Sequence, residues 1–299
     1  MVLVSDKPIY TIVLTSLIVL IMYFLHAGRQ RDTLPGTEEP MITIEFITAL
    51  FYEVDEQLGA IPKHPKAHLW PSEVVTLGLL HALKGGGNRA FYRWLTRDYH
   101  ALFPHLPERT RLFRLFTTHQ DWTQAFLAAP TVLGVIDTYG IELIHPMREG
   151  RSAKQIGRKG KSNRRWIVGV KLCWIVNQDG RVVDWQWTTA NACDNCFLPL
   201  IAQYEAQTIT LSDLGFRCKD GVPTNLKLCQ KRTWNERGII ETIFSFLTGV
   251  CSLKKLFHRS EWHLEAHLSY LVVLFNVLLE IAGTPTGQQM LPALKDFAL

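Results

Sequence analysis

Cysteine is scarce in this chain, and closely spaced cysteine pairs are rarer still. Six cysteines are spread over 299 residues, which argues against a disulfide scaffold and indicates a reducing compartment. Cys193 and Cys196 form a C-x-x-C motif, but Cys218 and Cys229 follow with ten residues between them, which is a poor zinc pattern. We therefore expect neither structural disulfides nor a structural zinc ion.

A large excess of charge of either sign is also lacking. The chain holds 32 Lys and Arg against 27 Asp and Glu, a formal net charge of +5. So small an excess does not identify a nucleic-acid-binding protein, because what matters is whether basic side chains gather on one face. Repeats and low-complexity tracts are absent, and 47% of the residues are hydrophobic, which excludes disorder of the whole chain.

The first forty residues differ in character from the rest. Residues 9–25 form an apolar run close to the shortest that spans a bilayer as a helix, and residues 29–40 resemble a linker. One interpretation is a membrane anchor, helped by Arg29 and Arg31 after the run. Another is that Met41 is the working start and residues 1–40 are upstream sequence. A buried helix remains open, whereas a cleaved signal peptide is disfavoured because no small-residue cleavage site follows.

Helical periodicity marks residues 41–129, the predicted N-terminal region. Apolar residues recur at intervals of three and four over residues 44–54 and again over residues 74–80. Ser72 is the predicted N-cap of the second helix, and the glycines at 85–87 are predicted to end it. An arginine-rich and aromatic segment follows, typical either of a solvated face or of helices that lie against phosphates. Its arginines are Arg89, Arg93, Arg97, Arg109, Arg111 and Arg114.

From Pro130 the pattern changes to strands, and residues 130–283 are predicted to form a second domain before a tail at 284–299. Three runs, with a turn signal before the third, predict an antiparallel meander, and a short fourth strand follows. The four predicted strands are residues 131–137, 164–176, 181–189 and 209–213. Helices are predicted near residues 195–204, 235–250 and 261–281. This order indicates an α/β fold in which helices cover a sheet.

Two of the predicted strands end on an aspartate, Asp137 and Asp213. An ionised side chain at such a place loses hydration and needs a compensating positive charge. A magnesium or manganese ion supplies that charge, since hard cations take oxygen ligands from one or two carboxylates. If the two strands are neighbours, the sequence predicts a shared metal site.

Glu241 is the third candidate acid, on the predicted helix at 235–250. It flanks the buried stripe of that helix, so its side chain can reach the rim of the sheet that the helix covers. The same face carries Arg237, Ser245 and Thr248. Two aspartates and one glutamate can hold two metal ions of the kind that act in phosphodiester chemistry.

The segments IDTYGIEL, LSDLGF and NERGIIETIFSFL, in this order, resemble the catalytic core of bacterial insertion-sequence transposases of the DDE class. These enzymes share the RNase H-like fold with retroviral integrases. The resemblance covers roughly residues 41–281 and implies an RNase H-like mixed sheet flanked by helices, preceded by an all-α region. It assigns Asp137, Asp213 and Glu241 as the catalytic, metal-binding acids, with Arg237 on the preceding turn.

This resemblance implies that two Mg²⁺ or Mn²⁺ ions are bound, that water hydrolyses a strand at the element's end, and that the freed 3′ hydroxyl attacks target DNA. The implied partners are double-stranded DNA and at least one further copy of the chain, in the cytoplasm at the nucleoid. Asp213 and Glu241 lie 28 positions apart, less than the family's common gap, so Glu236 is kept as an alternative. A metal-dependent nuclease without strand transfer and an inactive, DNA-binding relic remain the other interpretations.

Residues 145–166 concentrate positive charge between the first two predicted strands. Eight Lys and Arg face one acid, Glu149, which gives a net +7. Gly150, Gly157 and Gly160 predict a mobile loop that orders on a phosphate backbone, and a solubilising loop is the alternative. The predicted DNA contacts are Arg148, Arg151, Lys154, Arg158, Lys159, Lys161, Arg164, Arg165, Arg237, Lys254 and Lys255.

Overall fold

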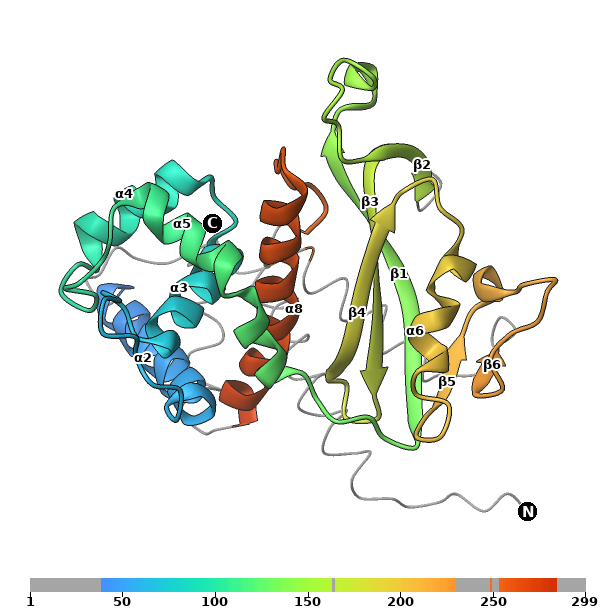
Figure 1. Ribbon diagram of the computed structural model, residues 1–299, viewed down its shortest axis with the longest axis horizontal. Coiled ribbons are helices and arrows are strands. Elements are labelled where there is room, and N and C mark those ends of the chain that lie inside the picture. Colours follow the sequence, from blue (N-terminus) through green and yellow to red (C-terminus); the bar gives the residue numbers. More distant parts are fainter. Residues whose placement is uncertain (1–38, 163–164, 230–247, 249–252, 284–299) are drawn as a thin grey trace, which may run out of the picture.

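The computed structural model describes residues 39–162, 165–229, 248 and 253–283 (Figure 1). The predictions for residues 1–38 and for the tail at 284–299 lie outside the described residues. So do Arg164 and, apart from Thr248, the predicted helix at 235–250, including Glu236, Arg237 and Glu241.

The N-terminal region is helical, as its periodicity predicts. Its elements are α2 (Glu39–Leu58), α3 (Pro71–Lys84), α4 (Asn88–Asp98), α5 (Arg109–Thr118) and the 3₁₀ helix η1 (Gln120–Phe126). Gly85 ends α3 in the left-handed conformation with φ 63°, as predicted. Ser72 is not the N-cap, however, because the helix begins one residue earlier, at Pro71. The carboxylate of Glu73 instead accepts a 2.6 Å hydrogen bond from the backbone N–H of Trp70.

A six-stranded mixed sheet forms the second half of the molecule. Its strands are β1 (Leu133–Ile144), β2 (Arg158–Ser162), β3 (Arg165–Asn177), β4 (Val182–Thr189), β5 (Ile209–Ser212) and β6 (Leu226–Leu228). The predicted meander is confirmed, since β3 pairs antiparallel with both β1 and β4. Beyond β1 the pairing becomes parallel, first to β5 and then to β6, a short strand that the sequence does not predict.

Part of the predicted mobile loop at 145–166 is a strand, β2. β2 pairs antiparallel with the first residues of β3. Two of its glycines are there because neighbouring backbone comes close: a Cβ at Gly160 would lie 1.9 Å from the carbonyl oxygen of Ala190, and one at Gly157 would lie 2.5 Å from the Cα of Gly169. These two glycines therefore reflect close packing of the backbone, and the residues between η2 (Pro146–Arg148) and β2 form an irregular segment.

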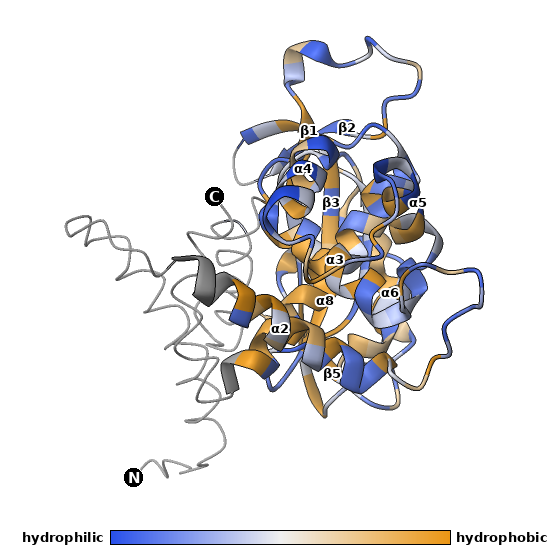
Figure 2. Ribbon diagram, turned by 90° about the vertical axis from the view of Figure 1, so that its left-hand side faces the viewer, coloured by the Kyte–Doolittle hydropathy of each residue, from blue (hydrophilic) through white to orange (hydrophobic). Residues whose placement is uncertain are grey.

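Helix α8 (Glu261–Gly283), which matches the predicted helix at 261–281, joins the two halves. It contacts α2, α3, α5 and η1 on one side and β4 on the other (Figure 1), and one continuous apolar core includes side chains from all of these elements. In Figure 2 the hydrophobic residues gather in α3, α8 and the strands, whereas the segment between β1 and β2 is largely hydrophilic. By length and composition residues Glu261–Ile281 could cross a membrane, but 83% of that window is buried inside the protein.

A second, smaller core covers the opposite face of the sheet. There the 3₁₀ helix η3 (Asp194–Phe197), α6 (Leu198–Ala202) and η4 (Leu214–Phe216) pack on side chains of β1, β3 and β4. The predicted helix at 195–204 is thus a 3₁₀ turn followed by a short α-helix.

Candidate active site

Asp137 and Asp213 come from adjacent parallel strands. β1 pairs with β5 so that Leu133 lies opposite Ile209 and Val135 opposite Leu211, the last pair of this ladder. Asp137 and Asp213 each follow that last pair by two residues. The prediction that the strands carrying the two acids are neighbours is therefore confirmed, and neighbouring strands lie about 4.8 Å apart. Both side chains are half-buried.

The two aspartates occupy different positions on their strands. Asp213 directly follows β5, as predicted, but Asp137 is not at the end of its strand, because β1 continues to Ile144. The residues after Asp137 stay extended since they pair with β3 as far as Val168. β1 therefore extends past the acid pair and supports the segment between β1 and β2.

Each aspartate is oriented by a backbone amide of its own segment. The Oδ1 of Asp137 accepts a 2.7 Å hydrogen bond from the N–H of Thr138. The Oδ1 of Asp213 accepts one of 2.8 Å from the N–H of Gly215 and so caps η4. Charge-assisted bonds of this kind fix a carboxylate before any ligand binds.

A third aspartate, Asp194, contacts the segments that follow Asp137 and Asp213. Asp194 Oδ1 accepts hydrogen bonds from Lys171 Nζ at 2.8 Å and from Thr138 Oγ1 at 2.9 Å. A Cβ at Gly215 would lie 2.7 Å from Asp194 Oδ2 and 2.9 Å from Asp213 Oδ1. Asp194 thus contacts the residue next to Asp137 and approaches the turn that follows Asp213.

The pKa of the Cys173 thiol, on β3, is affected by two of these carboxylates. Burial raises its pKa well above the usual value, and the carboxylates of Asp137 and Asp194 raise it further. The sequence carries one signal for this network: Lys171 is a lone cation within an apolar strand, and a buried cation requires a partner. Asp194 is that partner.

A helical residue lies against the face of β1 that carries Asp137. Thr248 Oγ1 donates a 2.9 Å hydrogen bond to the Oη of Tyr139, and Thr248 itself is helical. Tyr139 is two residues from Asp137, so both side chains point to the same face of the sheet. Glu241, the third predicted acid, lies outside the described residues.

The composition of the acid pair suits a hard divalent cation. Magnesium commonly binds through one or two carboxylates and takes its remaining oxygen ligands from water and substrate phosphates, and Asp137 with Asp213 supplies two carboxylates. Within the described residues, no group of three or more His, Cys, Asp or Glu side chains is arranged to hold a metal ion.

The predicted DNA contacts near β1 and β2 are exposed. Arg148, Arg151 and Lys154 lie in the segment between these strands, Arg158, Lys159 and Lys161 on β2, and Arg165 at the start of β3. Lys254 and Lys255 are exposed on the segment that pairs with the end of β1, through a bridge between Glu142 and Lys255. Glu142 is buried and faces Lys255 Nζ at 3.3 Å and Arg165 at 3.9 Å.

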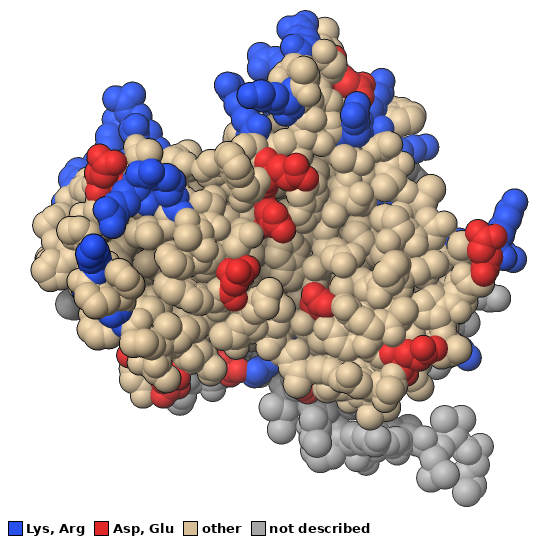
Figure 3. Space-filling view, in the orientation of Figure 1, with Lys and Arg blue, Asp and Glu red and all other residues tan. Residues whose placement is uncertain are grey.

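Basic side chains cover two prominences with a depression between them. In Figure 3, Lys and Arg gather on the protruding segment between β1 and β2 and on the helices at the left, while acidic side chains lie below the protrusion and along the boundary between helices and sheet. The arginines of α4 and α5 are all exposed: Arg89, Arg93, Arg97, Arg109, Arg111 and Arg114. A phosphate backbone laid across the depression meets cations on both sides.

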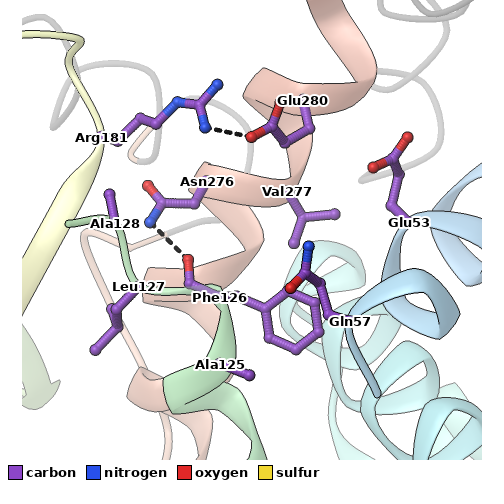
Figure 4. A pocket seen from close by; sticks show the side chains of 10 residues that line it. All are labelled: Glu53, Gln57, Ala125, Phe126, Leu127, Ala128, Arg181, Asn276, Val277 and Glu280. Carbon is purple, nitrogen blue, oxygen red and sulfur yellow. Dashed lines mark hydrogen bonds and ion pairs between the residues drawn. The ribbon is translucent and has the colours of Figure 1, made fainter. Parts of the chain in front are cut away.

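A separate cavity of about 250 Å³ lies where α2, η1 and α8 meet the start of β4 (Figure 4). Two of its charged side chains, those of Arg181 and Glu280, form an ion pair with each other. Asn276 Nδ2 donates to the carbonyl oxygens of Phe126 and Val182, each at 2.9 Å. These contacts join α8 to its neighbours and account for the polarity of the cavity.

Comparison of the chain with protein-family models, curated proteins and solved structures found no match.

Proposed function

We propose that this chain is a DNA transposase that cleaves and joins DNA strands by metal-dependent phosphoryl transfer. The observation that carries the proposal is that Asp137 and Asp213 each lie two residues beyond the last paired residues of adjacent parallel strands, in a molecule with a basic prominence on each side of a depression. The strand order supports it as well. Three antiparallel strands followed by two parallel ones, ordered β4-β3-β1-β5-β6, is the arrangement expected of an RNase H-like sheet.

Asp137, Asp213 and Glu241 are the proposed ligands of the metal. When bound, a pair of magnesium ions activates the attacking oxygen and stabilises the leaving oxygen of a phosphodiester. Glu241 precedes Thr248 by seven residues, which is two turns of the helix that the sequence predicts. The hydrogen bond from Thr248 to Tyr139 therefore favours Glu241 over Glu236, whose position five residues earlier falls on another face.

The basic side chains hold and orient DNA in this proposal. Arg148, Arg151 and Lys154 contact phosphates on one side of the depression, and the arginines of α4 and α5 contact them on the other. Such contacts fix the register of a duplex without reading its sequence. The strand to be cut is thereby held over the aspartates, whose orientation the amides of Thr138 and Gly215 set in advance.

The test uses the full chain with Mg²⁺ and a labelled DNA fragment that spans its own gene and flanking sequence, plus an unlabelled target plasmid. We expect cuts at discrete positions on both sides of the gene, followed by labelled strands joined to the plasmid. Asp137→Asn and Asp213→Asn should each lower both reactions by roughly a thousandfold or more, while DNA binding persists. Asp220→Asn is the matched control, because this exposed acid lies in the turn before β6.

The other outcomes contradict the proposal in distinguishable ways. Cuts without joined products identify a metal-dependent nuclease. Binding without cuts identifies a protein that retains only DNA binding. Full activity of both aspartate variants, with folding checked by circular dichroism, would show that the assigned acids are wrong.

A further inference from the structure

A cavity of about 500 Å³ opens between the segment that follows β1 and the segment that precedes α8. Its lining includes Met147, Arg148 and Arg151 from the first segment and Lys255, Phe257 and Arg259 from the second. The volume falls within the usual range for small-molecule sites. The cavity is separate from the acid pair, since neither Asp137 nor Asp213 lines it.

Two large apolar side chains of this cavity are open to solvent. Met147 is 79% exposed and Phe257 77% exposed, whereas most large apolar side chains of the described residues are buried. Lys255 Nζ lies 5.6 Å from the centre of the Phe257 ring. An exposed aromatic ring beside a cation is the surface on which nucleic-acid bases stack.

The charge of the cavity has one sign. Four cationic side chains line it, and among the described lining residues none is Asp or Glu. His258, also in the wall, adds no charge at neutral pH, because burial and the neighbouring His263 lower its pKa to about 4. The fixed charges therefore select an anionic ligand.

One wall is held in place before any ligand binds. Glu142 N–H donates to the carbonyl oxygen of Lys254 at 3.1 Å, and Leu256 N–H donates to the carbonyl oxygen of Glu142 at 2.9 Å. These bonds extend the sheet by one bridge. They fix the backbone that carries Lys255 and Phe257, so little conformational entropy is lost on this side when a ligand binds.

We infer that this cavity holds one unpaired nucleotide at the end of a DNA duplex. The base stacks on Phe257 beside Met147, and the phosphates on either side of it contact Arg148, Arg151 and Arg259. The cavity combines an exposed aromatic ring with a cationic lining. A free phosphate would not contact the ring, and a base that is still paired cannot reach it. The inference rests on the proposed function in one respect, which is that DNA is the ligand.

The test measures binding of the full chain, without metal, to three fluorescent duplexes of one core sequence by anisotropy. One duplex is blunt, and the others end in one unpaired thymidine, at the 3′ end or the 5′ end. We expect at least one unpaired end to bind about tenfold more tightly than the blunt duplex, the size of one base stacked on an aromatic ring. An abasic unit in place of that thymidine should remove the gain, which separates stacking from an added phosphate.

Variants then assign the gain to the cavity. Phe257→Ala should abolish the preference for the unpaired end and leave blunt-duplex binding within about twofold, whereas Phe257→Trp should retain it. Trp262→Ala is the matched control, because Trp262 is 67% exposed and does not line the cavity. Equal binding of blunt and unpaired ends, an unchanged gain in Phe257→Ala, or equal loss in Trp262→Ala would overturn the inference.

Failure here and failure of the proposed function are distinguishable. The binding assay contains no metal and uses variants outside the acid pair. If the chain cuts and joins DNA but shows no preference for an unpaired end, only the inference about the cavity is rejected. A stacking-dependent end preference in a chain that cuts no DNA would reject the transposase and leave the cavity assigned.

Discussion

Lys171 is a cation on a buried strand, and its side chain is only 13% exposed. Its ammonium donates to Asp194 Oδ1 and to the carbonyl oxygen of Ala192, both at 2.8 Å. Because Asp194 also accepts from Thr138, the ion pair joins β1 and β3 to the segment that begins η3.

Lys171→Met should lower the free energy of unfolding by about 1–3 kcal/mol, because it leaves a largely buried carboxylate without its cation. Denaturant unfolding monitored by circular dichroism measures the change. Removing both charges in Lys171→Met with Asp194→Leu should recover much of the loss.

Arg97→Gln provides the comparison for that prediction. Arg97 pairs with Asp98 at 2.6 Å, but its side chain is 78% exposed, so the free energy of unfolding should stay close to that of the parent. A Lys171→Met protein as stable as the parent would show that the buried ion pair contributes nothing.

At the scale of elements, α8 is the helix on which the two halves meet. Gly78 of α3 faces Tyr270 of α8, and a Cβ at Gly78 would lie 2.4 Å from the tyrosine ring. Tyr270 Oη in turn donates to the carbonyl oxygen of Phe116, in α5, at 3.3 Å. The close approach of α3 and α8 thus depends on one missing side chain.

Gly78→Ala should destabilise the protein by about 1–3 kcal/mol, because the added methyl group overpacks a buried contact. Thermal unfolding is a suitable measurement. Gly86→Ala is the matched control, since nothing lies within 4 Å of a Cβ at that position, and its melting temperature should stay near that of the parent. Equal melting temperatures for both variants would show that α3 and α8 can shift apart without cost.

The helices and strands whose apolar residues recur with a regular period can be predicted from the sequence. Those that form only through tertiary contacts cannot. The meander, β5, α3 and α8 follow from apolar periodicity alone. β2 does not, because its charged side chains and glycines have the composition of a loop, and only pairing with β3 makes the segment a strand. β6 is three residues long and too short for any period to appear.

The candidate site was predictable in part for the same reason. Asp137 and Asp213 each follow an apolar run, and the expected neighbouring strands bring them together. The extension of β1 beyond Asp137 depends on its pairing with β3 and is not visible in the local pattern. The local pattern does not indicate the ion pair of Asp194, because its partner, Lys171, is 23 residues away.

At the scale of the whole molecule, three histidines connect the N-terminal helices with the segment before α8. The ring of His267 lies 5.7 Å from that of His81 in α3 and 4.7 Å from that of His258. Burial, with neighbouring histidines, lowers the pKa of His81 to about 3, of His258 to about 4, and of His267 well below its usual value. All three are neutral in the folded protein near pH 7.

The free energy of unfolding should therefore fall as the pH is lowered. In the unfolded chain these rings take up protons below about pH 6.5, whereas in the folded chain they do so only near pH 4 and below. The unfolded state binds more protons across that window, so stability is complete above it and decreases through it, by up to about 1.4 kcal/mol per pH unit for each histidine. Denaturant unfolding at a series of pH values measures the slope.

His267→Phe should flatten that slope by about one third and raise stability in acid. Neither ring nitrogen of His267 has a hydrogen-bond partner in the described part of the chain, so an apolar ring leaves no polar group stranded. His105→Gln, at an exposed position, is the control and should keep the parent's slope. An unchanged slope in His267→Phe would assign the acid sensitivity to other groups.

The parallel pairing of β1 with β5 also determines when the two aspartates can first come onto neighbouring strands. Asp137 and Asp213 are 76 positions apart in the chain, and β3 and β4 are made between them, so their meeting is a late, non-local event in folding. Residue 213 and β5, the strand that precedes it, must leave the ribosome before β5 can pair with β1. A chain that ends before residue 213 therefore carries the basic segment between β1 and β2 but lacks one of the two aspartates that the proposed function requires.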